Sequence, residues 1–305
     1  MAIRTDQRPA APRPEPVRLT PRGRRAVAVT MALLVTAATA YALIATPLGT
    51  LLGVTAGPPC TLTHHTGAET ATTAWTAEQA MTATTVAGVG TRIGATRGGV
   101  AAAVTDALSV VEELDPPRAM TNQEARAVYR ALPDVATPDA QALGLAEALL
   151  GHDGGALTCV VPLASPDLTG PSAAETPNEL GLTPRADLVR VELRAVFGKQ
   201  VLGGFAPDGV RSGHIEGSAH YEGRAVDVFF RPVSRANQRL GWQEAQWAVA
   251  HAERLHVATV IFDRRVWTAR RSVEGWRDYR HPSGDTDNPV LMHEDHVHVD
   301  VLEGG

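Results

Sequence analysis

A long uncharged stretch follows directly on a strongly basic arm at the start of the sequence. Residues 26–46 carry no Asp, Glu, Lys or Arg, whereas residues 1–25 carry seven arginines against two acidic residues. A helix over residues 26–46 would rise about 32 Å, which just crosses a hydrocarbon layer of about 30 Å. Apart from Tyr41, its polar residues are threonines, so it lacks the polar face of a helix packed in a soluble core. The pattern predicts one N-terminal transmembrane helix.

The distribution of positive charge predicts the orientation of this helix. The positive-inside rule keeps the basic arm in the cytoplasm and sends residues after about 58 to the other side of the membrane. Ala38-Thr39-Ala40 also has the small residues of a signal-peptidase site, so cleavage and secretion remain the alternative. Both interpretations place the body of the protein outside the cytoplasm, and we expect a single-pass protein of the cell membrane.

The body is acidic and contains both cysteines. The whole chain carries a formal charge of −5, and since the arm carries +5, the rest carries −10. An acidic body argues against nucleic acid as a partner. Cys60 and Cys159 can pair in an oxidising compartment, so we expect a disulfide between them. The alternative is a pair of buried free thiols.

Residues 58–161 show helical signals and are expected to form an all-α extracytoplasmic domain that serves as a spacer or binding module. The following residues, 162–183, are rich in Pro, Ser, Thr and Gly and predict a linker. The helical signals are two capping boxes, at 76–79 and 121–124, apolar residues at helical spacing over 100–114 and 125–132, and a shorter helix over 139–150.

The last part of the chain, residues 184–305, mixes helix and strand patterns. Pro184 follows Thr183 and marks a helix start, after which Leu188, Val191, Ala195 and Val196 lie on one face. A second helix is expected over 242–255, leading into a strand over 257–262. This mixture predicts an α+β fold with an antiparallel sheet and flanking helices.

Two strands of this last part alternate between apolar and polar residues. They cover 225–230 and 296–301, and in the second one Val297, Val299 and Val301 face one way. His296, His298 and Asp300 then face the other way, since successive side chains of a strand point to opposite faces. Three polar groups on one strand face indicate that this face is not packed in the core.

A dense motif, Ser218-Ala-His220-Tyr-Glu-Gly223-Arg-Ala225-Val-Asp227, leads into the first of these strands. Gly223 permits a tight turn that brings His220 back over Asp227. Pairing this strand with 296–301 lets one imidazole, one carboxylate and a second imidazole converge. Two histidines and a carboxylate with an open position form a catalytic zinc site in many enzymes, and nitrogen and oxygen ligands favour Zn²⁺ over Ca²⁺ or Mg²⁺.

This motif resembles that of the D-alanyl-D-alanine carboxypeptidase-like metallopeptidases, which share the lysostaphin and hedgehog zinc fold. The resemblance covers about residues 185–305 and rests on Ser218, His220, Gly223, Ala225 and Asp227, followed by Asp295-His296-Val297-His298. That second motif has D-x-x-H where many members have E-x-x-H. The resemblance implies zinc as the cofactor, with His220, Asp227 and His298 as its ligands.

The resemblance also implies roles for neighbouring residues. Asp295 falls at the position of the general base, with His296 beside it to stabilise the oxyanion, and Glu294 is the competing base. Arg211 is expected to meet a substrate carboxylate, and Ser218 to fix the turn that carries the first ligand.

These roles lead to one expected function and one alternative. We expect a zinc peptidase that hydrolyses amide bonds in peptidoglycan peptides, either a carboxypeptidase or an endopeptidase. The alternative is a zinc-containing binding module of the cell envelope without catalytic activity.

Overall fold

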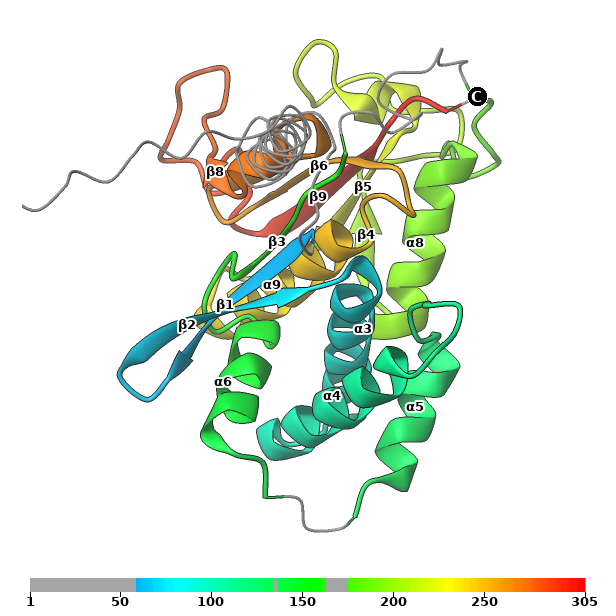
Figure 1. Ribbon diagram of the computed structural model, residues 1–305. Helices are drawn as coiled ribbons and strands as arrows, with labels where there is room; N and C mark the ends of the chain where they lie inside the picture. The colour runs from blue at the N-terminus through cyan, green and yellow to red at the C-terminus, as the bar shows by residue number, and fades with distance from the viewer. Residues whose placement is uncertain (1–58, 134–136, 163–174, 305) are drawn as a thin grey trace, which may run out of the picture.

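The fold is seen in a computed structural model that describes residues 59–133, 137–162 and 175–304. The basic arm 1–25, the predicted membrane span 26–46 and residues 163–174 of the predicted linker lie outside these ranges. Within them, no helix is long and apolar enough to cross a bilayer. The described chain is α+β, with antiparallel sheets and helices (Figure 1).

A small sheet, with two strands before the helices of this part and one after them, corrects the expectation of an all-α segment over 58–161. Its strands lie in the order β2-β1-β3 and are β1 (Cys60–Thr66), β2 (Glu69–Trp75) and β3 (Leu157–Cys159). Buried side chains alternate along β1 at Cys60, Leu62 and His64, with a period of two. Threonine-rich segments favour strands because β-branched side chains pack well on a pleated surface. The sequence prediction of helix over the whole segment rested on the capping boxes at 76–79 and 121–124, which lie after β1 and β2.

The predicted disulfide is confirmed. Cys60 and Cys159 are directly paired residues of β1 and β3, and their sulfurs are bonded across a sequence separation of 99 residues. Because disulfides persist in oxidising compartments, this bond supports a position of the body outside the cytoplasm.

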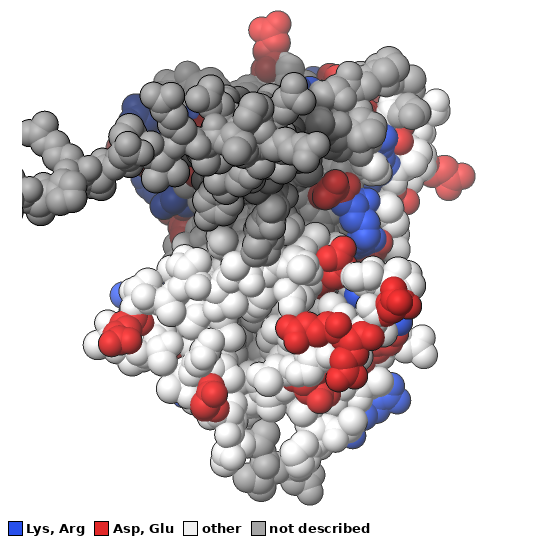
Figure 2. Space-filling model, in the orientation of Figure 1, with Lys and Arg blue, Asp and Glu red and all other residues white. Residues whose placement is uncertain are grey.

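Four helices of this part follow the sequence signals. They are α3 (Ala77–Ile93), α4 (Arg97–Glu112), α5 (Asn122–Ala131) and α6 (Ala140–Leu149). Both predicted capping boxes are present, one at Thr76 with Gln79 and one at Thr121 with Glu124. Figure 2 shows acidic side chains gathered over the helical part of one face.

The second sheet carries the two alternating strands side by side. Its order is β4-β5-β9-β6-β7-β8, and each neighbouring pair is antiparallel. Two short 3₁₀ helices, η1 (Ala219–Glu222) and η2 (Ala269–Glu274), border it. The strands are β4 (Val201–Gly203), β5 (Ala225–Phe229), β6 (Val257–Phe262), β7 (Arg265–Thr268), β8 (Arg277–Asp278) and β9 (His296–Val301).

The helices that cover this sheet differ in part from expectation. Helix α9 spans Arg235–Ala250 and begins after the N-cap Ser234, seven residues before the expected start at 242. Helix α8 spans Pro184–Phe197 as predicted. Its predicted apolar face is wrong at Leu188 and Val191, which are 43% and 47% exposed, whereas Val196 of the same predicted face is buried. The helix has two adjacent apolar stripes, and the buried one comprises Ala186, Val189, Leu193 and Val196.

Helix α9 lies between the two parts of the molecule (Figure 1). It contacts α3 and β3 on one side and β6 and β9 on the other. Gln246 accepts a hydrogen bond from the Leu157 amide and donates one to the Ala148 carbonyl. Residues before and after the predicted linker therefore contribute to one continuous hydrophobic core.

Candidate metal centre

The candidate metal site is built on two directly paired residues of β5 and β9. Asp227 lies opposite His298 in the antiparallel register, so both side chains project from the same face. On the opposite face, Val226, Val228 and Val299 are buried in the core. The predicted pairing of these strands and their alternation are confirmed.

A short turn brings His220 over this pair. His220 lies in η1, whose N-cap Ser218 accepts a weak hydrogen bond, 3.4 Å long, from the His220 amide. Gly223 ends η1 with a φ of 69°, a left-handed conformation that glycine adopts without strain. A Cβ on Gly223 would also lie 2.3 Å from the Gly181 carbonyl oxygen, so a larger residue does not fit. Ser218 thus has the predicted place at the start of the turn.

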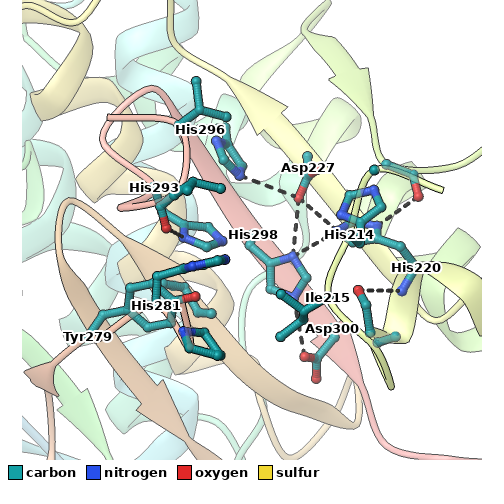
Figure 3. Close-up of a pocket in the computed structure, with 18 of the residues that line it drawn as sticks. His214, Ile215, His220, Asp227, Tyr279, His281, His293, His296, His298 and Asp300 are labelled. Carbon is teal, nitrogen blue, oxygen red and sulfur yellow. Dashed lines mark hydrogen bonds and ion pairs between the residues drawn. The ribbon is translucent and has the colours of Figure 1, made fainter. Parts of the chain in front are cut away.

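Three potential ligand atoms of these residues meet at one point (Figure 3). His220 Nε2 is 3.0 Å from His298 Nδ1 and 3.3 Å from Asp227 Oδ1. His298 Nδ1 is 3.2 Å from the same carboxylate oxygen. Ligands bound at 2.0–2.1 Å to a tetrahedral zinc ion lie about 3.3–3.4 Å from one another, so this spacing fits such an ion. All three side chains are buried, and within the described ranges they are the one group of this kind.

The outer nitrogen of each histidine is held by a hydrogen-bond acceptor. His220 Nδ1 donates to the Gly204 carbonyl at 2.7 Å, and His298 Nε2 donates to Asp300 Oδ2 at 3.2 Å. These bonds leave His220 Nε2 and His298 Nδ1 as lone-pair donors when the rings are neutral. Metal-binding histidines usually have such an outer partner, which fixes the tautomer and raises the basicity of the ligand.

The electrostatics of the group favour a cation at its centre. Burial by itself lowers the pKa of His298, but hydrogen bonds and charge interactions with Asp227 and Asp300 outweigh it and raise the pKa to about 10. Burial also opposes the charge of Asp227, but its contacts with His220 and His298 hold the pKa of this carboxyl well below its ordinary value. Three close acceptor atoms repel one another unless a proton or a metal ion lies between them. His220, Asp227 and His298 can therefore hold a metal ion.

His296 and Asp295 lie directly beside the three potential metal ligands. His296 Nδ1 donates to Asp295 Oδ1 at 2.7 Å, and its Nε2 is 4.0 Å from Asp227 Oδ1. The other oxygen of Asp295 accepts a hydrogen bond of 2.6 Å from Arg231 Nε. Asp295 is 4% exposed and does not line the cavity above the metal ligands, whereas His296 does.

The remaining predicted residues lie outside this arrangement. Glu294 forms an ion pair with Arg264, and neither residue lines the cavity. Arg211 is exposed and is also absent from the cavity wall. Glu294 and Arg211 therefore lie apart from the site. The residues that the structure brings together are His220, Asp227, His298, His296 and Asp295.

A cavity of about 800 Å³ opens over the metal ligands. Two loops border it, one before η1 and one before β9. The His214 ring stacks on that of His220, with centroids 4.0 Å apart, and His293 packs against His296 at 4.6 Å. Figure 3 shows His214 and His293 on opposite sides of the three ligands.

These two histidines were missed from the sequence. They lie in loops, where no strand or helix period predicts which side chain faces the site. The pKa of His293 is lowered to about 2, mainly by burial and further by charge interactions with His298 and His296. His293 is therefore a neutral imidazole at the cavity wall.

Comparison with known families adds one finding. Residues 178–290 match the family described as VldE, C-terminal domain, while no curated protein and no solved structure matches the chain. The matched segment includes His220 and Asp227 and ends before β9, which carries His298. About a third of this chain is thus similar to the VldE C-terminal domain, and that part provides two of the three potential metal ligands.

Proposed function

We propose that this protein is a zinc-dependent hydrolase that cleaves amide bonds of cell-wall peptides outside the cytoplasm. The observation that carries the proposal is the convergence of His220 Nε2, Asp227 Oδ1 and His298 Nδ1 within 3.0–3.3 Å of one another. An open cavity above these atoms leaves room for a substrate, as a catalytic site requires.

The ligand set indicates which chemistry a bound ion would contribute. A zinc ion held by these two histidines and one carboxylate would supply a Lewis acid, lowering the pKa of water toward about 7 and polarising a carbonyl group. Hydrolysis adds the hydroxyl of water to the acyl carbon and breaks the C–N bond, so a proton must reach the leaving nitrogen.

His296 is our candidate for moving this proton. Its Nδ1–H is held by Asp295, so Nε2 is the nitrogen that lies near the metal ligands and can accept or donate a proton. Asp295 accepts hydrogen bonds on both oxygens, and in this proposal it orients His296 rather than contacting the substrate itself. This assigns Asp295 a positioning role in place of the general-base role that the resemblance implied.

The expected location supports cell-wall peptides as the substrate class. The Cys60–Cys159 disulfide supports an extracytoplasmic body, and the predicted N-terminal anchor would hold this body next to the cell wall. The formal charge of −10 beyond the arm argues against a nucleic acid.

The test measures metal content and hydrolysis with the full chain. Elemental analysis should give one zinc per chain, and mass spectrometry should show cleaved amide bonds in muropeptides. His298→Ala should lose both zinc and product, whereas His65→Ala, at an exposed histidine of β1, should keep both. Asp295→Asn should keep zinc but lose about 10²–10⁴-fold in rate, since it disturbs a proton-transfer group.

Two results would contradict the proposal in different ways. A wild-type chain that binds zinc but yields no more product than His298→Ala would be a zinc-containing binding module. If the chain binds no zinc at all, the same three side chains have a structural role instead.

A further inference from the structure

A second, smaller cavity of about 250 Å³ lies away from the candidate metal centre. None of the described residues on its wall belongs to the wall of the larger cavity. One side is the loop that follows α6, with Gly151, His152 and Gly154, and the other side is the first part of α9. Residues from before and after the predicted linker therefore form this second cavity together.

Two glycines let the loop approach α9 closely. A Cβ on Gly151 would lie 2.2 Å from the Arg239 carbonyl oxygen, and a Cβ on Gly154 would lie 2.6 Å from Trp242 Nε1. Gly151 also has a φ of 76°, which glycine adopts without strain. This fit places His152, between the two glycines, directly beside the helix.

The wall of the second cavity carries positive charge. Arg235 and Arg239 are four residues apart in α9, so they lie on the same side of the helix. Neither guanidinium has a hydrogen bond or ion pair with a residue that the structure describes, although the chain beyond the basic arm carries a net charge of −10. Like charges at this spacing destabilise a helix slightly, so the fold itself gains nothing from the pair.

Asp263 is the one carboxylate on this wall within the described ranges, and both of its oxygens are already used. Oδ1 accepts a hydrogen bond of 3.0 Å from Gln238 Nε2, and Oδ2 accepts one of 3.0 Å from Trp242 Nε1. Asp263 therefore does not neutralise the two arginines, and their guanidinium groups are available to a negatively charged ligand.

His152 adds an uncharged hydrogen-bonding group beside the arginines. Burial lowers the pKa of His152, and the positive charge of Arg239 lowers it further, while Glu147 and Asp153 act in the opposite direction. Each of these two carboxylates already contacts a basic side chain of its own, and neither lines the second cavity. Near neutral pH His152 is thus an uncharged imidazole with one N–H to donate.

We propose that the second cavity binds the phosphate group of a phosphate monoester, with Arg235 and Arg239 as charged ligands and His152 as a hydrogen-bond donor. Guanidinium groups bind phosphate oxygens through parallel charge-assisted hydrogen bonds. A carboxylate has two oxygens and one charge, which a single guanidinium can satisfy. A monoester has three terminal oxygens and nearly two charges, so it matches two guanidinium groups.

The volume of the cavity bears on the source of the phosphate. It is several times the share of one water molecule in the liquid, about 30 Å³, so a short organic group fits beside the phosphate. Free inorganic phosphate presents the same chemistry to the arginines, and the two probes of the test distinguish these sources.

The test is isothermal titration calorimetry with the full chain at low ionic strength and about pH 8, where a phosphate monoester carries close to two charges. Inorganic phosphate and glycerol 3-phosphate should both bind to the wild type. Acetate and diethyl phosphate, with one charge each, should bind at least about 10-fold more weakly. Tighter binding of glycerol 3-phosphate than of inorganic phosphate would identify an organic monoester as the ligand, and the reverse order would identify free phosphate.

The variant that tests the site is Arg235→Gln/Arg239→Gln. It should lose about 10–100-fold in affinity for both phosphate probes, the range for removing charge-assisted hydrogen bonds. Arg194→Gln is the matched control, since it removes an exposed arginine of α8 that also has no partner among the described side chains. This control should bind phosphate like the wild type.

Thermal unfolding shows whether the double variant is folded. Without ligand its unfolding temperature should be no lower than that of the wild type, because a pair of like charges is removed. Phosphate should raise the unfolding temperature of the wild type, since a ligand stabilises the state that binds it, and should leave that of the double variant unchanged.

The proposed hydrolase activity and this site stand or fall separately. His298→Ala removes a ligand of the candidate metal centre, whose cavity shares no wall residue with the second cavity, and should bind phosphate like the wild type. Two results would overturn the site. One is a wild type that binds phosphate no better than acetate, and the other is phosphate binding that survives in the double variant.

Discussion

The two histidines of the candidate metal centre present different nitrogens to its middle, and the cause lies in the partners of their other ring nitrogens. His220 is held through Nδ1 by a backbone carbonyl, whereas His298 is held through Nε2 by the Asp300 carboxylate. The second partner carries a charge, so it adds to the basicity of the ligand nitrogen as well as fixing the ring.

Asp300→Ala should therefore weaken zinc binding without removing a ligand. We expect a loss of about 10–100-fold in affinity, the usual effect of losing an outer partner of a metal-binding histidine. Competition with a chromophoric chelator measures it, and Asp153→Ala, which lies outside the cavity wall, is the control. Equal zinc affinity in the wild type and Asp300→Ala would contradict this role of Asp300.

Glu244 is a buried carboxyl that the site does not use. One oxygen accepts a hydrogen bond from Gln200, while its Oε2 and the Gln200 Oε1 have no hydrogen-bond partner among the residues that the structure describes. Burial raises the pKa of Glu244 from 4.5 to about 8. The folded protein thus holds this proton more tightly than the unfolded chain, and stability falls as the pH rises from about 4.5 to about 8.

Glu244→Gln should remove this pH dependence. At pH 9 the variant should be more stable than the wild type, on the order of 5 kcal/mol, with a much smaller difference at pH 4. Urea unfolding at both pH values measures the effect, with Glu253→Gln at an exposed site of the same region as control. The same pH profile in wild type and Glu244→Gln would show that Glu244 is ionised at little cost.

At the scale of elements, the strand patterns predicted the site well because one face had to be polar. The alternation in 225–230 and 296–301 identified β5 and β9, and their pairing placed Asp227 against His298. The loops before η1 and β9 were not predictable in this way. Their side chains are directed by turns and tertiary contacts, so the places of His214 and His293 at the cavity were found only in the structure.

Two misreadings of elements also have physical causes. The β1–β2 hairpin is largely polar on its outer face, so apolar periodicity gave little strand signal beside the strong helix caps that follow. In α8 the pattern predicted the helix but not its buried side, since two neighbouring stripes are apolar and packing against the rest of the fold decides between them.

Gly204, directly after strand β4, provides the backbone carbonyl that holds the outer nitrogen of His220. A Cβ on Gly204 would lie 2.2 Å from His220 Cε1. Gly204→Ala should therefore displace the His220 ring and lower zinc affinity, on the order of 100-fold, because a ligand and its outer partner both move. Gly213→Ala is a matched control, with a similar positive φ of 93° and no atom of the described ranges within 4 Å of the added Cβ.

Zinc titration of both variants tests this role of Gly204. Backbone strain is common to the two substitutions, so the difference between them reports the contact with His220. Equal affinities in Gly204→Ala and Gly213→Ala would show that the ring tolerates the added methyl group.

At the scale of the whole molecule, α9 joins the two sheets into one core. Trp247 is 1% exposed, donates to Thr85 of α3 and packs edge-on against Phe197 of α8. Core contacts of this kind transmit destabilisation across the whole cooperative unit.

Trp247→Ala should therefore destabilise both parts of the described chain together, by about 3–5 kcal/mol. Hydrogen exchange should show the amides of α3 and β9 losing protection at the same urea concentration. Leu188→Ala, at a half-exposed position of α8, should have a small effect. Separate transitions for α3 and β9 would show instead two domains that unfold independently.

The central claim is that His220, Asp227 and His298 hold one divalent metal ion. A crystal structure of the zinc-loaded full chain, with anomalous diffraction recorded on both sides of the zinc edge, tests it most directly. We predict one anomalous peak at about 2.0–2.1 Å from His220 Nε2, Asp227 Oδ1 and His298 Nδ1. Zinc located elsewhere, or a zinc-free site in a crystal grown with zinc in excess, would contradict the account.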